Sequence, residues 1–232
     1  MNKKKYEFLT GRYHPDLVPT QLSANKLIHH EIIQPLNDLY QTLKTDHFEL
    51  FIVSGHRNHL EQVRIWNEKV SGKRPISDES GNILDIKTLS NEDIVRFICR
   101  WSAIPGASRH HWGTDIDVIC TNSLPNKDYQ VQLIPEEVDE NGIFGPFHKK
   151  LDELIKTKKA FNFYRPYGKD RAGVAPEKWH LSFKPLASTY LHKYTIDIFE
   201  RNIIESNILL KEIILKDLEY FFKNFVLNVC RT

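Results

Sequence analysis

The sequence predicts an α+β fold, in which helices flank a small, mainly antiparallel sheet and a long helical segment follows at the C-terminal end. Strand and helix patterns are mixed without the strict alternation that is typical of a parallel sheet. After Pro185 the chain has no glycine or proline, and apolar residues recur at helical spacing as far as Phe225. This tail is expected to form one long amphipathic helix or a pair of helices. Short apolar runs predict strands at 48–54, 114–119, 161–164 and 178–183.

The helices ahead of this tail are predicted by apolar periodicity and by capping residues. In the first of them, Pro35 marks either a kink or the first turn, because proline lacks a backbone N–H. Asn58 and Ser90 can each cap the start of a helix. The polar stretch 121–144 is expected to be a loop that allows a strand near Val131. Together these signals predict helices at 24–44, 58–70, 90–101 and 145–158.

Composition excludes several classes of protein. The chain has 232 residues, with 32 basic and 30 acidic side chains, and a nucleic-acid-binding protein would usually carry a strong basic excess. No apolar run approaches the roughly 20 residues of a membrane-spanning helix. The three cysteines, Cys99, Cys120 and Cys230, are too widely spaced for a disulfide framework or a thiolate zinc site. We therefore expect a globular protein with buried thiols.

The length fits a single domain over residues 1–232. We expect a helical lead-in at 1–45, a core at 46–186 that carries the chemically informative motifs, and a helical extension at 187–232. The first residues are basic, but no apolar run follows them, so no signal peptide is visible.

Histidines and aspartates are concentrated in the segment 108–117, which reads Ser-Arg-His-His-Trp-Gly-Thr-Asp-Ile-Asp. Asp115 and Asp117 are two residues apart on a predicted strand, so their side chains point to the same face. An acidic pair among apolar neighbours is costly unless a positive charge lies against it. A zinc ion held by histidine and carboxylate, with one position open to water, is such a charge. The alternative is a solvated surface hairpin.

A second segment, Pro176-Glu-Lys-Trp-His180, contains another carboxylate and another imidazole. Glu177 and His180 would lie on opposite faces of a straight strand, and they converge only if Glu177 is still in the turn that Pro176 favours. That arrangement suits a metal-ligating histidine with a carboxylate near the metal. The alternative is a salt-bridged glutamate and a half-buried histidine. Together the two segments make a three-ligand set available, consisting of His110, Asp117 and His180.

The third segment, Ser54-Gly-His-Arg57, lies where a buried strand is predicted to end and a helix to begin. From that junction Arg57 could project into a site at the edge of the sheet and bind an oxyanion or a carboxylate. Gln62 is five residues further on and could face the same way. The alternative is a solvated surface arginine.

In this order and spacing, the three segments resemble the motif set of the zinc D-alanyl-D-alanine carboxypeptidases of the VanY type. That group also includes VanX-type dipeptidases, L,D-carboxypeptidases and some phage endolysins. The string 105–117, with Leu9-Thr-Gly-Arg near the start, is similar to a VanY-like bacterial subgroup. The motifs as they stand here are Ser54-Gly-His-Arg57 with Gln62, Ser108-x-His110-x-x-Gly113-x-x-x-Asp117, and Glu177-x-Trp179-His180.

The resemblance implies a role for each matching position. It places one zinc ion per chain on His110, Asp117 and His180, and the catalytic base on Glu177. Arg57 falls on the arginine that holds the scissile carbonyl or a substrate carboxylate.

Three residues depart from the family pattern. His56 stands where the family usually has tyrosine, and Asp115 stands where it usually has a small residue. His111 directly follows the expected ligand; neighbours on an extended chain point apart, and the family spacing selects His110. His111 is then either beside the site or exposed. The substrate-contacting positions of the family fall on Gln62, Ser108, Tyr167 and Trp179, of which Trp179 would wall the pocket.

The resemblance implies a zinc-dependent carboxypeptidase that removes the terminal D-Ala from peptidoglycan stem peptides, of the D-Ala-D-Ala or the L,D type. Metal-activated water would attack the peptide bond, with Glu177 as general base. One alternative is an endopeptidase of the phage-lysin type. Another is a non-catalytic zinc-containing binding domain, which the presence of both Glu177 and Arg57 argues against. The substrate favours the cell envelope as the place of action, and the cytoplasm is the alternative because no signal peptide is visible.

Overall fold

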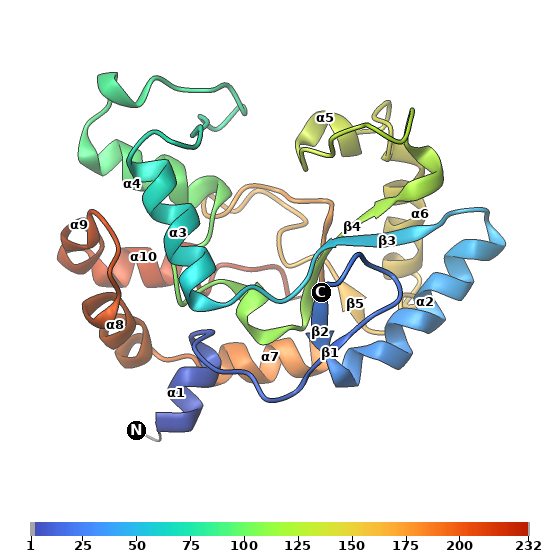
Figure 1. The fold of residues 1–232 in the computed structure, drawn as a ribbon, viewed down its shortest axis with the longest axis horizontal. Helices are drawn as coiled ribbons and strands as arrows, with labels where there is room; N and C mark the ends of the chain where they lie inside the picture. The colour runs from blue at the N-terminus through green and yellow to red at the C-terminus, as the bar shows by residue number, and fades with distance from the viewer. Residues whose placement is uncertain (1–2, 232) are drawn as a thin grey trace.

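A four-stranded antiparallel sheet lies at the centre of the fold, with helices on its flanks (Figure 1). The computed structural model describes residues 3–231; residues 1, 2 and 232, the ends of the predicted single domain, lie outside that range. The helices and strands of the described residues, in chain order, are α1 (Lys3–Leu9), β1 (Leu17–Pro19), β2 (Leu27–His29), η1 (His30–Ile32), α2 (Ile33–Thr45), β3 (Leu50–Ser54), α3 (His59–Val70), η2 (Ile86–Thr88), α4 (Asn91–Trp101), η3 (Arg109–Trp112), β4 (Asp115–Cys120), η4 (Thr121–Ser123), α5 (Pro135–Val138), α6 (Gly145–Lys156), β5 (Phe163–Tyr164), β6 (His180–Phe183), α7 (Lys184–Lys193), α8 (Ile196–Glu205), α9 (Lys211–Lys216) and α10 (Leu218–Phe225).

The main sheet has the strand order β3-β4-β6-β5, and a separate two-stranded sheet pairs β1 with β2. β4 is buried along its whole length between β3 and β6. Its register sets Asp117 opposite Ser54 on one side and opposite His180 on the other. Residues directly opposite each other in an antiparallel pair have close side chains. The strand pairing alone therefore brings Asp117 and His180 together.

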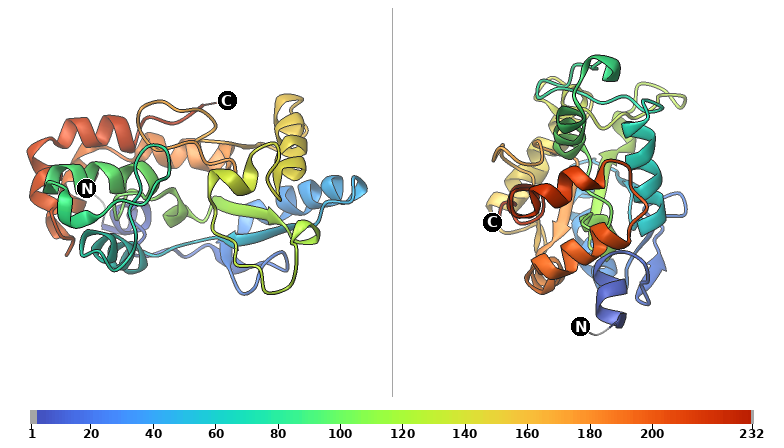
Figure 2. Two further views of the ribbon diagram at one scale, coloured as in Figure 1. Left: turned by 90° about the horizontal axis from the view of Figure 1, so that it is seen from above. Right: turned by 90° about the vertical axis from the view of Figure 1, so that its left-hand side faces the viewer.

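Two apolar clusters hold the molecule together, and Figure 2 shows helices of the first, α2 and α6, at one end of the ribbon and helices of the second, α8–α10, at the other. One joins the main sheet to α2 and α6, with Leu36 and Phe147 fully buried in it. The other joins α1, α3, α4 and α7–α10 around Trp66 and Phe199. Burial of each such side chain stabilises the fold by about 1.5–3 kcal/mol. Trp112 belongs to the helical cluster and Ile116 to the sheet cluster, so the segment between them crosses the junction.

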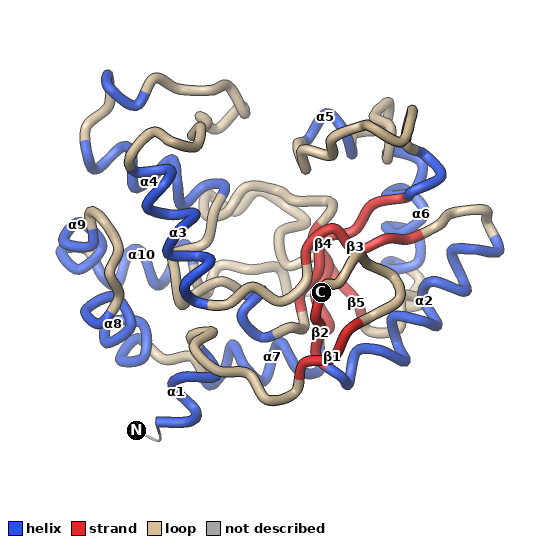
Figure 3. The backbone as a smooth tube through the Cα atoms, in the orientation of Figure 1, coloured by secondary structure: helices blue, strands red, loops and turns tan. Residues whose placement is uncertain are grey.

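The α+β class predicted from the sequence is confirmed, and strands make up a small part of the chain (Figure 3). Asn58 and Ser90 cap α3 and α4 as expected. The helix predicted over 24–44 begins only at Ile33, with Pro35 in its first turn. Of the residues before it, 27–29 form β2, which pairs with β1, and 30–32 form η1; the N–H of His29 donates to the carbonyl oxygen of Gly113 at 2.8 Å. These long-range contacts outweigh the local helical pattern.

Two other expectations need correction. The C-terminal tail forms neither one helix nor a pair but the separate helices α7–α10. The side chain of Thr195 caps α8, and Leu210 adopts a left-handed conformation with φ 59° before α9, so the tail turns without glycine or proline. In the described residues there is no strand near Val131, because the N–H groups of Gln132 and Leu133 donate to the carboxylate of Glu137 and not to a neighbouring strand.

The cysteines are free, with Cys99 and Cys120 buried. Within residues 3–231, no helix combines the length and apolarity needed to cross a bilayer.

Candidate active site

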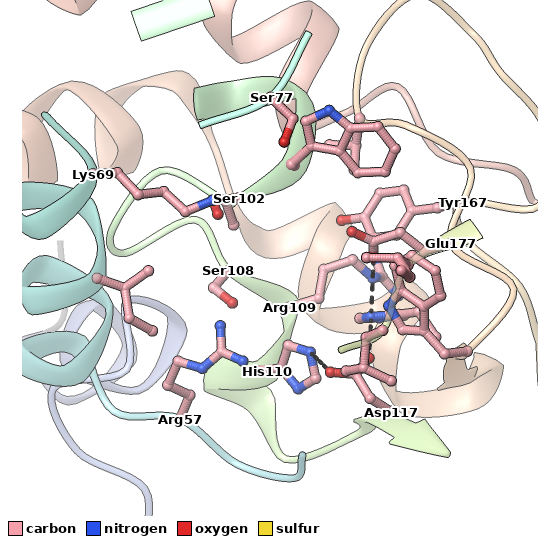
Figure 4. Close-up of a pocket in the computed structure, with 18 of the residues that line it drawn as sticks. Arg57, Lys69, Ser77, Ser102, Ser108, Arg109, His110, Asp117, Tyr167 and Glu177 are labelled. Atoms are coloured by element: carbon pink, nitrogen blue, oxygen red, sulfur yellow. Dashed lines mark ion pairs between the residues drawn. The ribbon is translucent and has the colours of Figure 1, made fainter. Parts of the chain in front are cut away.

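A cavity of about 520 Å³ lies where the two clusters meet. One side, here called the sheet wall, comes from η3, β4, β6 and the loop before β6. The opposite side, called the helix wall, comes from α3, the loop after it and the residues that follow α4. Figure 4 shows Arg57, Lys69, Ser102 and Ser108 on one side of the space and Asp117, Tyr167 and Glu177 on the other. The sheet wall consists of His110, Asp117, Tyr167, Glu177, Trp179 and His180, and the helix wall of Arg57, Ile65, Lys69, Arg74, Ser102 and Ser108.

His110, Asp117 and His180 converge on the sheet wall. Each is buried and offers one ligand atom, and the three atoms lie within 4.8 Å of one another. His110 Nε2 is 3.3 Å from Asp117 Oδ2, and His180 Nδ1 is 3.1 Å from Asp117 Oδ1. The two imidazole rings are nearly perpendicular, with centroids 4.9 Å apart. Two histidines and one carboxylate that leave a position open to solvent are a ligand set typical of catalytic zinc.

Two glycines bring His110 to this place. Gly113, at φ 66°, ends η3 and turns the chain into β4, and a Cβ there would lie 2.7 Å from the side chain of Leu17. Gly55 follows β3, and a Cβ there would lie 2.5 Å from the carbonyl oxygen of Leu27. Because both positions lack room for a side chain, the β1–β2 pair can pack closely against the end of η3 and the end of β3.

Each histidine is oriented by a hydrogen bond from its other ring nitrogen. His110 Nδ1 donates to the carbonyl oxygen of Gly55 at 2.9 Å, and His180 Nε2 donates to Asp115 Oδ1 at 3.0 Å. The proton positions follow, because both partners can only accept. Asp115 also accepts from Arg109 Nε at 2.7 Å and from the hydroxyl of Thr114 at 2.8 Å. Such outer partners fix ring orientation and raise ligand basicity.

The arrangement fits a divalent cation. The lone pairs of His110 Nε2 and His180 Nδ1 face a buried carboxylate, and among residues 3–231 Asp117 Oδ1 accepts no well-aligned hydrogen bond. Burial lowers the pKa of His180, but hydrogen bonds to Asp115 and Asp117 more than offset this and raise it to about 10. The site therefore strongly favours a positive charge between these side chains. Asp115, which the sequence left without a role, supports the metal-binding set and does not belong to it.

Glu177 lies beside this group, in the turn before β6. The N–H of Glu177 donates to the carbonyl oxygen of Tyr167, and the N–H of His180 donates back to that of Glu177, so the two residues share a tight turn. Glu177 Oε2 is 3.6 Å from His180 Nδ1. The pKa of Glu177 is raised to about 7, mainly by burial and also by Asp117, although the positive charges of His180, Arg57 and Lys69 oppose the rise. A carboxyl with such a pKa can accept and return a proton near neutral pH.

Arg57 precedes α3 and reaches the cavity from the helix wall. Asn58 and Glu61 form a reciprocal capping box that starts α3 just after Arg57. The guanidinium donates to Gln62 Oε1 at 2.9 Å and to Ser54 Oγ at 3.1 Å. These bonds hold the guanidinium on the helix wall, so that it faces the sheet wall across the cavity (Figure 4).

Gln62 differs from the other predicted substrate contacts, because it does not line the cavity. Its side chain is buried, and its amide donates to the carbonyl oxygen of Ala103 at 2.8 Å while its oxygen accepts from Arg57. Gln62 thus orients Arg57. Ser108, Tyr167 and Trp179 do line the cavity, and the ring centroid of Tyr167 is 5.1 Å from that of His180.

His111 is buried, which excludes the exposed alternative. Its Nδ1 donates to the carbonyl oxygen of Arg57 at 2.6 Å, and its Nε2 accepts from the N–H of Gly106 at 3.0 Å. Gly11 packs so closely on this ring that a Cβ there would lie 2.4 Å from it. His111 therefore ties the backbone of Arg57 to the chain that leads into η3.

Sequence reasoning missed two cations of the helix wall, Lys69 and Arg74, and the buried Arg109 behind the sheet wall. One signal could have found Lys69: it follows Gln62 by seven residues, which is two helical turns, so both project from the same face of α3. Nothing local distinguishes Arg109, whose guanidinium binds Asp115, Ser182 and Tyr164 from three different parts of the chain.

Comparison with known proteins assigns the chain to a family. The sequence model of VanY, described as D-alanyl-D-alanine carboxypeptidase, matches residues 25–186. The chain belongs to the VanY family. The match covers most of the chain and the three motif segments between Ser54 and His180, and it confirms the resemblance noted from the sequence.

Solved structures share the VanY fold. A vancomycin-resistance D,D-pentapeptidase VanY from a VanB-type cassette, solved in complex with Zn(II), is 20% identical with a TM-score of 0.53, covering 88% of this chain and 91% of its own. VanYB in complex with D-alanine-D-alanine gives the same identity and TM-score, covering 84% and 92%. The LdcB LD-carboxypeptidase is 21% identical with a TM-score of 0.50, covering 82% and 80%. The Zn(II) in the first of these agrees with the zinc ion expected here and with the metal-competent group on the sheet wall.

Two proteins of Haemophilus influenzae, both described as uncharacterized, are related in sequence. One is 34% identical over 100 residues, which is 42% of this chain and 68% of its own length. The other is 33% identical over 97 residues, covering 41% and 71%.

The VanY match supports a peptidase of the carboxypeptidase class, and the finer specificity has to be argued from the cavity.

Proposed function

We propose that this VanY-family protein is a zinc-dependent carboxypeptidase that removes the terminal D-Ala from peptidoglycan stem peptides. The observation that carries the proposal is the placement of Glu177 beside His110, Asp117 and His180, with Arg57 on the opposite wall of the same cavity. The D-alanine-D-alanine bound to VanYB is the kind of ligand we expect here. We further propose that the protein acts in the cell envelope, where such a substrate is found.

The protein side chains would divide the chemistry of hydrolysis. When bound by His110, Asp117 and His180, zinc supplies a Lewis acid for the reaction. Glu177 takes a proton from the attacking water as its oxygen bonds to the carbonyl carbon, and it returns that proton to the amine nitrogen as the carbon–nitrogen bond breaks. Arg57 donates to the carbonyl oxygen as negative charge develops there, an effect typically worth about 3–4 kcal/mol per donor.

The remaining residues would shape the site. Trp179 and Tyr167 line the sheet wall with large rings, and both are nearly buried. Ser108 offers a hydroxyl on the helix wall, near Arg57 (Figure 4). Such a cavity can hold a short peptide terminus between a polar wall and an aromatic one.

The test is mass spectrometry of defined tetrapeptide and pentapeptide stems after incubation with the zinc-loaded protein. We expect products that have lost one alanine. The matched control is the zinc-loaded Glu177→Ala protein, which should leave the peptides intact while still binding zinc. A chelator should abolish the reaction, and added zinc should restore it.

Two outcomes would contradict the proposal. Fragments larger than one alanine would identify an endopeptidase of the phage-lysin type. Intact peptides after incubation with zinc-loaded protein would favour a binding domain that has no turnover.

A further inference from the structure

Lys69 is the one cation lining the cavity that has no partner among the described residues. Arg57 binds Ser54 and Gln62, Arg74 pairs with Glu68, and Arg109 pairs with Asp115. Lys69 makes no hydrogen bond or ion pair at comparable distance within residues 3–231. An ammonium that is partly removed from water and unpaired is costly, unless a ligand supplies the opposite charge.

The groups around Lys69 favour the binding of an anion beside its ammonium group. Burial is the main cause that lowers the pKa of Lys69 to about 8; the nearby Arg74 and Arg57 contribute to this, and Glu177 opposes it. Three positive groups thus lie along one wall, and two of them are already engaged. Figure 4 shows the Lys69 side chain extending from α3 toward Ser102, above Ser108.

Arg57 lies nearer than Lys69 to the metal-competent group of His110, Asp117 and His180. The backbone N–H of Arg57 donates to the carbonyl oxygen of His110 at 3.2 Å. In Figure 4 Arg57 lies beside His110, whereas Lys69 lies on the far side of Ser108. A scissile carbonyl held near His110 would therefore be next to Arg57. The next peptide residue, about 3.5 Å long when extended, would bring its end toward Ser108 and Lys69.

We propose that Lys69 binds the free C-terminal carboxylate of the residue that is removed, which makes the cavity selective for a peptide terminus over an internal peptide bond. The inference rests on the proposed function and adds that two different residues bind two different groups of the substrate. Arg57 serves the carbonyl oxygen, and Lys69, with the hydroxyl of Ser108, serves the carboxylate. Lys69 is then a specificity residue that touches the substrate at the end of the leaving group.

The experiment compares one stem pentapeptide with a free C-terminus and the same peptide as a C-terminal amide. Both are assayed with the zinc-loaded wild-type, Lys69→Met and Lys69→Arg proteins. The control is Lys73→Met, because Lys73 is exposed on the loop after α3 and does not line the cavity. Thermal melting checks that every variant is folded.

The wild-type protein should prefer the free acid. Lys69→Met should lower kcat/KM for the acid about 10–100-fold, mainly through KM, because one charge-assisted hydrogen bond is lost. The amide should be unaffected, so the preference disappears. Lys69→Arg should keep most of the preference, and Lys73→Met all of it. An unchanged ratio of acid to amide in Lys69→Met, or an equal loss on both peptides, would overturn the proposal.

A binding measurement tests this inference independently of the proposed function. Titration calorimetry of both peptides into zinc-loaded Glu177→Ala protein, with and without Lys69→Met, needs no turnover. Tighter binding of the acid that depends on Lys69 supports the inference even if the wild-type protein cleaves neither peptide. Cleavage by the wild-type protein without any Lys69-dependent preference supports the proposed function and overturns the inference.

Discussion

The sheet wall and the helix wall of the cavity differ in how completely the protein pairs their polar groups. On the sheet wall both histidines are fixed by a second hydrogen bond, His110 to Gly55 and His180 to Asp115. On the helix wall Arg57 is held by two neutral groups, and Lys69 has no partner among the described residues. The sheet wall is therefore preorganised for an ion of fixed geometry, whereas the helix wall keeps donors free for a ligand that comes and goes.

The two walls are also anchored differently. The sheet wall depends on strand register, because Asp117 and His180 face each other across β4 and β6. The helix wall depends on side-chain contacts at the start of α3, where His111 holds the backbone of Arg57 and Gln62 holds its guanidinium. Substitutions of His110, Asp117 or His180 on the sheet wall should therefore affect metal binding, and those on the helix wall should affect substrate turnover with the metal retained.

The largest effects are expected on the sheet wall. His180→Ala should abolish hydrolysis and greatly weaken zinc retention, because one of three ligands is lost. Glu177→Ala should lower kcat about 10²–10⁴-fold, the usual contribution of a general base, and keep the zinc. Zinc content after dialysis and peptide hydrolysis measure the two effects separately. His192→Ala, an exposed histidine on α7, is the control. Full activity of Glu177→Ala would refute its role as the base.

The success of the sequence prediction differs between the walls in the same way. Two-residue spacing on a strand places Asp115 and Asp117 on one face, and both in fact contact His180. Pro176 predicts the turn that lets Glu177 converge with His180, and the structure has that turn. These relations are local or follow from strand pairing, so a sequence pattern can carry them.

Contacts across the two clusters could not be predicted in this way. The sequence left the role of His111 open between two alternatives. It also predicted that Gln62 contacts the substrate, because the hydrogen bond from Gln62 to Ala103 joins residues 41 positions apart and leaves no local pattern. Thr195 and Leu210 lie at the starts of α8 and α9 and divide a tail that has no glycine or proline, through a side-chain cap and a left-handed backbone that periodicity does not reveal.

A substitution on the helix wall tests whether that wall serves turnover and not metal binding. Arg57→Ala should lower kcat about 10²–10³-fold, because a donor to the developing oxyanion is lost. Zinc affinity should stay unchanged, since the Arg57 side chain bonds to Ser54 and Gln62, and the backbone bond of Arg57 to His110 is kept in the variant. Steady-state kinetics and a competition assay with a zinc chelator measure the two quantities. Arg64→Ala on the exposed face of α3 is the control. Loss of zinc from Arg57→Ala would break the distinction between the walls.

A smaller effect is expected behind the sheet wall. Asp115→Asn keeps the size of the side chain but removes the charge that faces Arg109 and His180. Zinc affinity should fall about 10–100-fold, as is usual when the outer partner of a ligating histidine is changed. The melting temperature should also fall, because Arg109 is left buried without its counter-charge. Chelator competition gives the affinity. A lower melting temperature with unchanged zinc affinity would mean that Asp115 supports the fold alone.

The smallest effect is expected for a substitution of His59, through which α3 of the helix wall contacts two other parts of the chain. Its Nδ1 lies 3.2 Å from the carbonyl oxygen of Thr10 and its Nε2 lies 3.2 Å from Ser206 Oγ, which connects α3 to the chain after α1 and to the end of α8.

Burial and, to a smaller extent, the charge of Arg12 lower the pKa of His59 to about 4. An unfolded chain protonates histidine near pH 6.5, so between about pH 6.5 and 4 the unfolded state binds more protons and the free energy of unfolding falls as the pH falls. His59→Gln removes this titration but keeps a polar side chain. The melting temperature of the variant should be a few degrees lower at pH 8, yet it should decrease less than that of the wild type between pH 7 and 4.5. Other buried histidines retain part of the slope in both proteins. Equal slopes would show that His59 does not link the helix wall to acid stability.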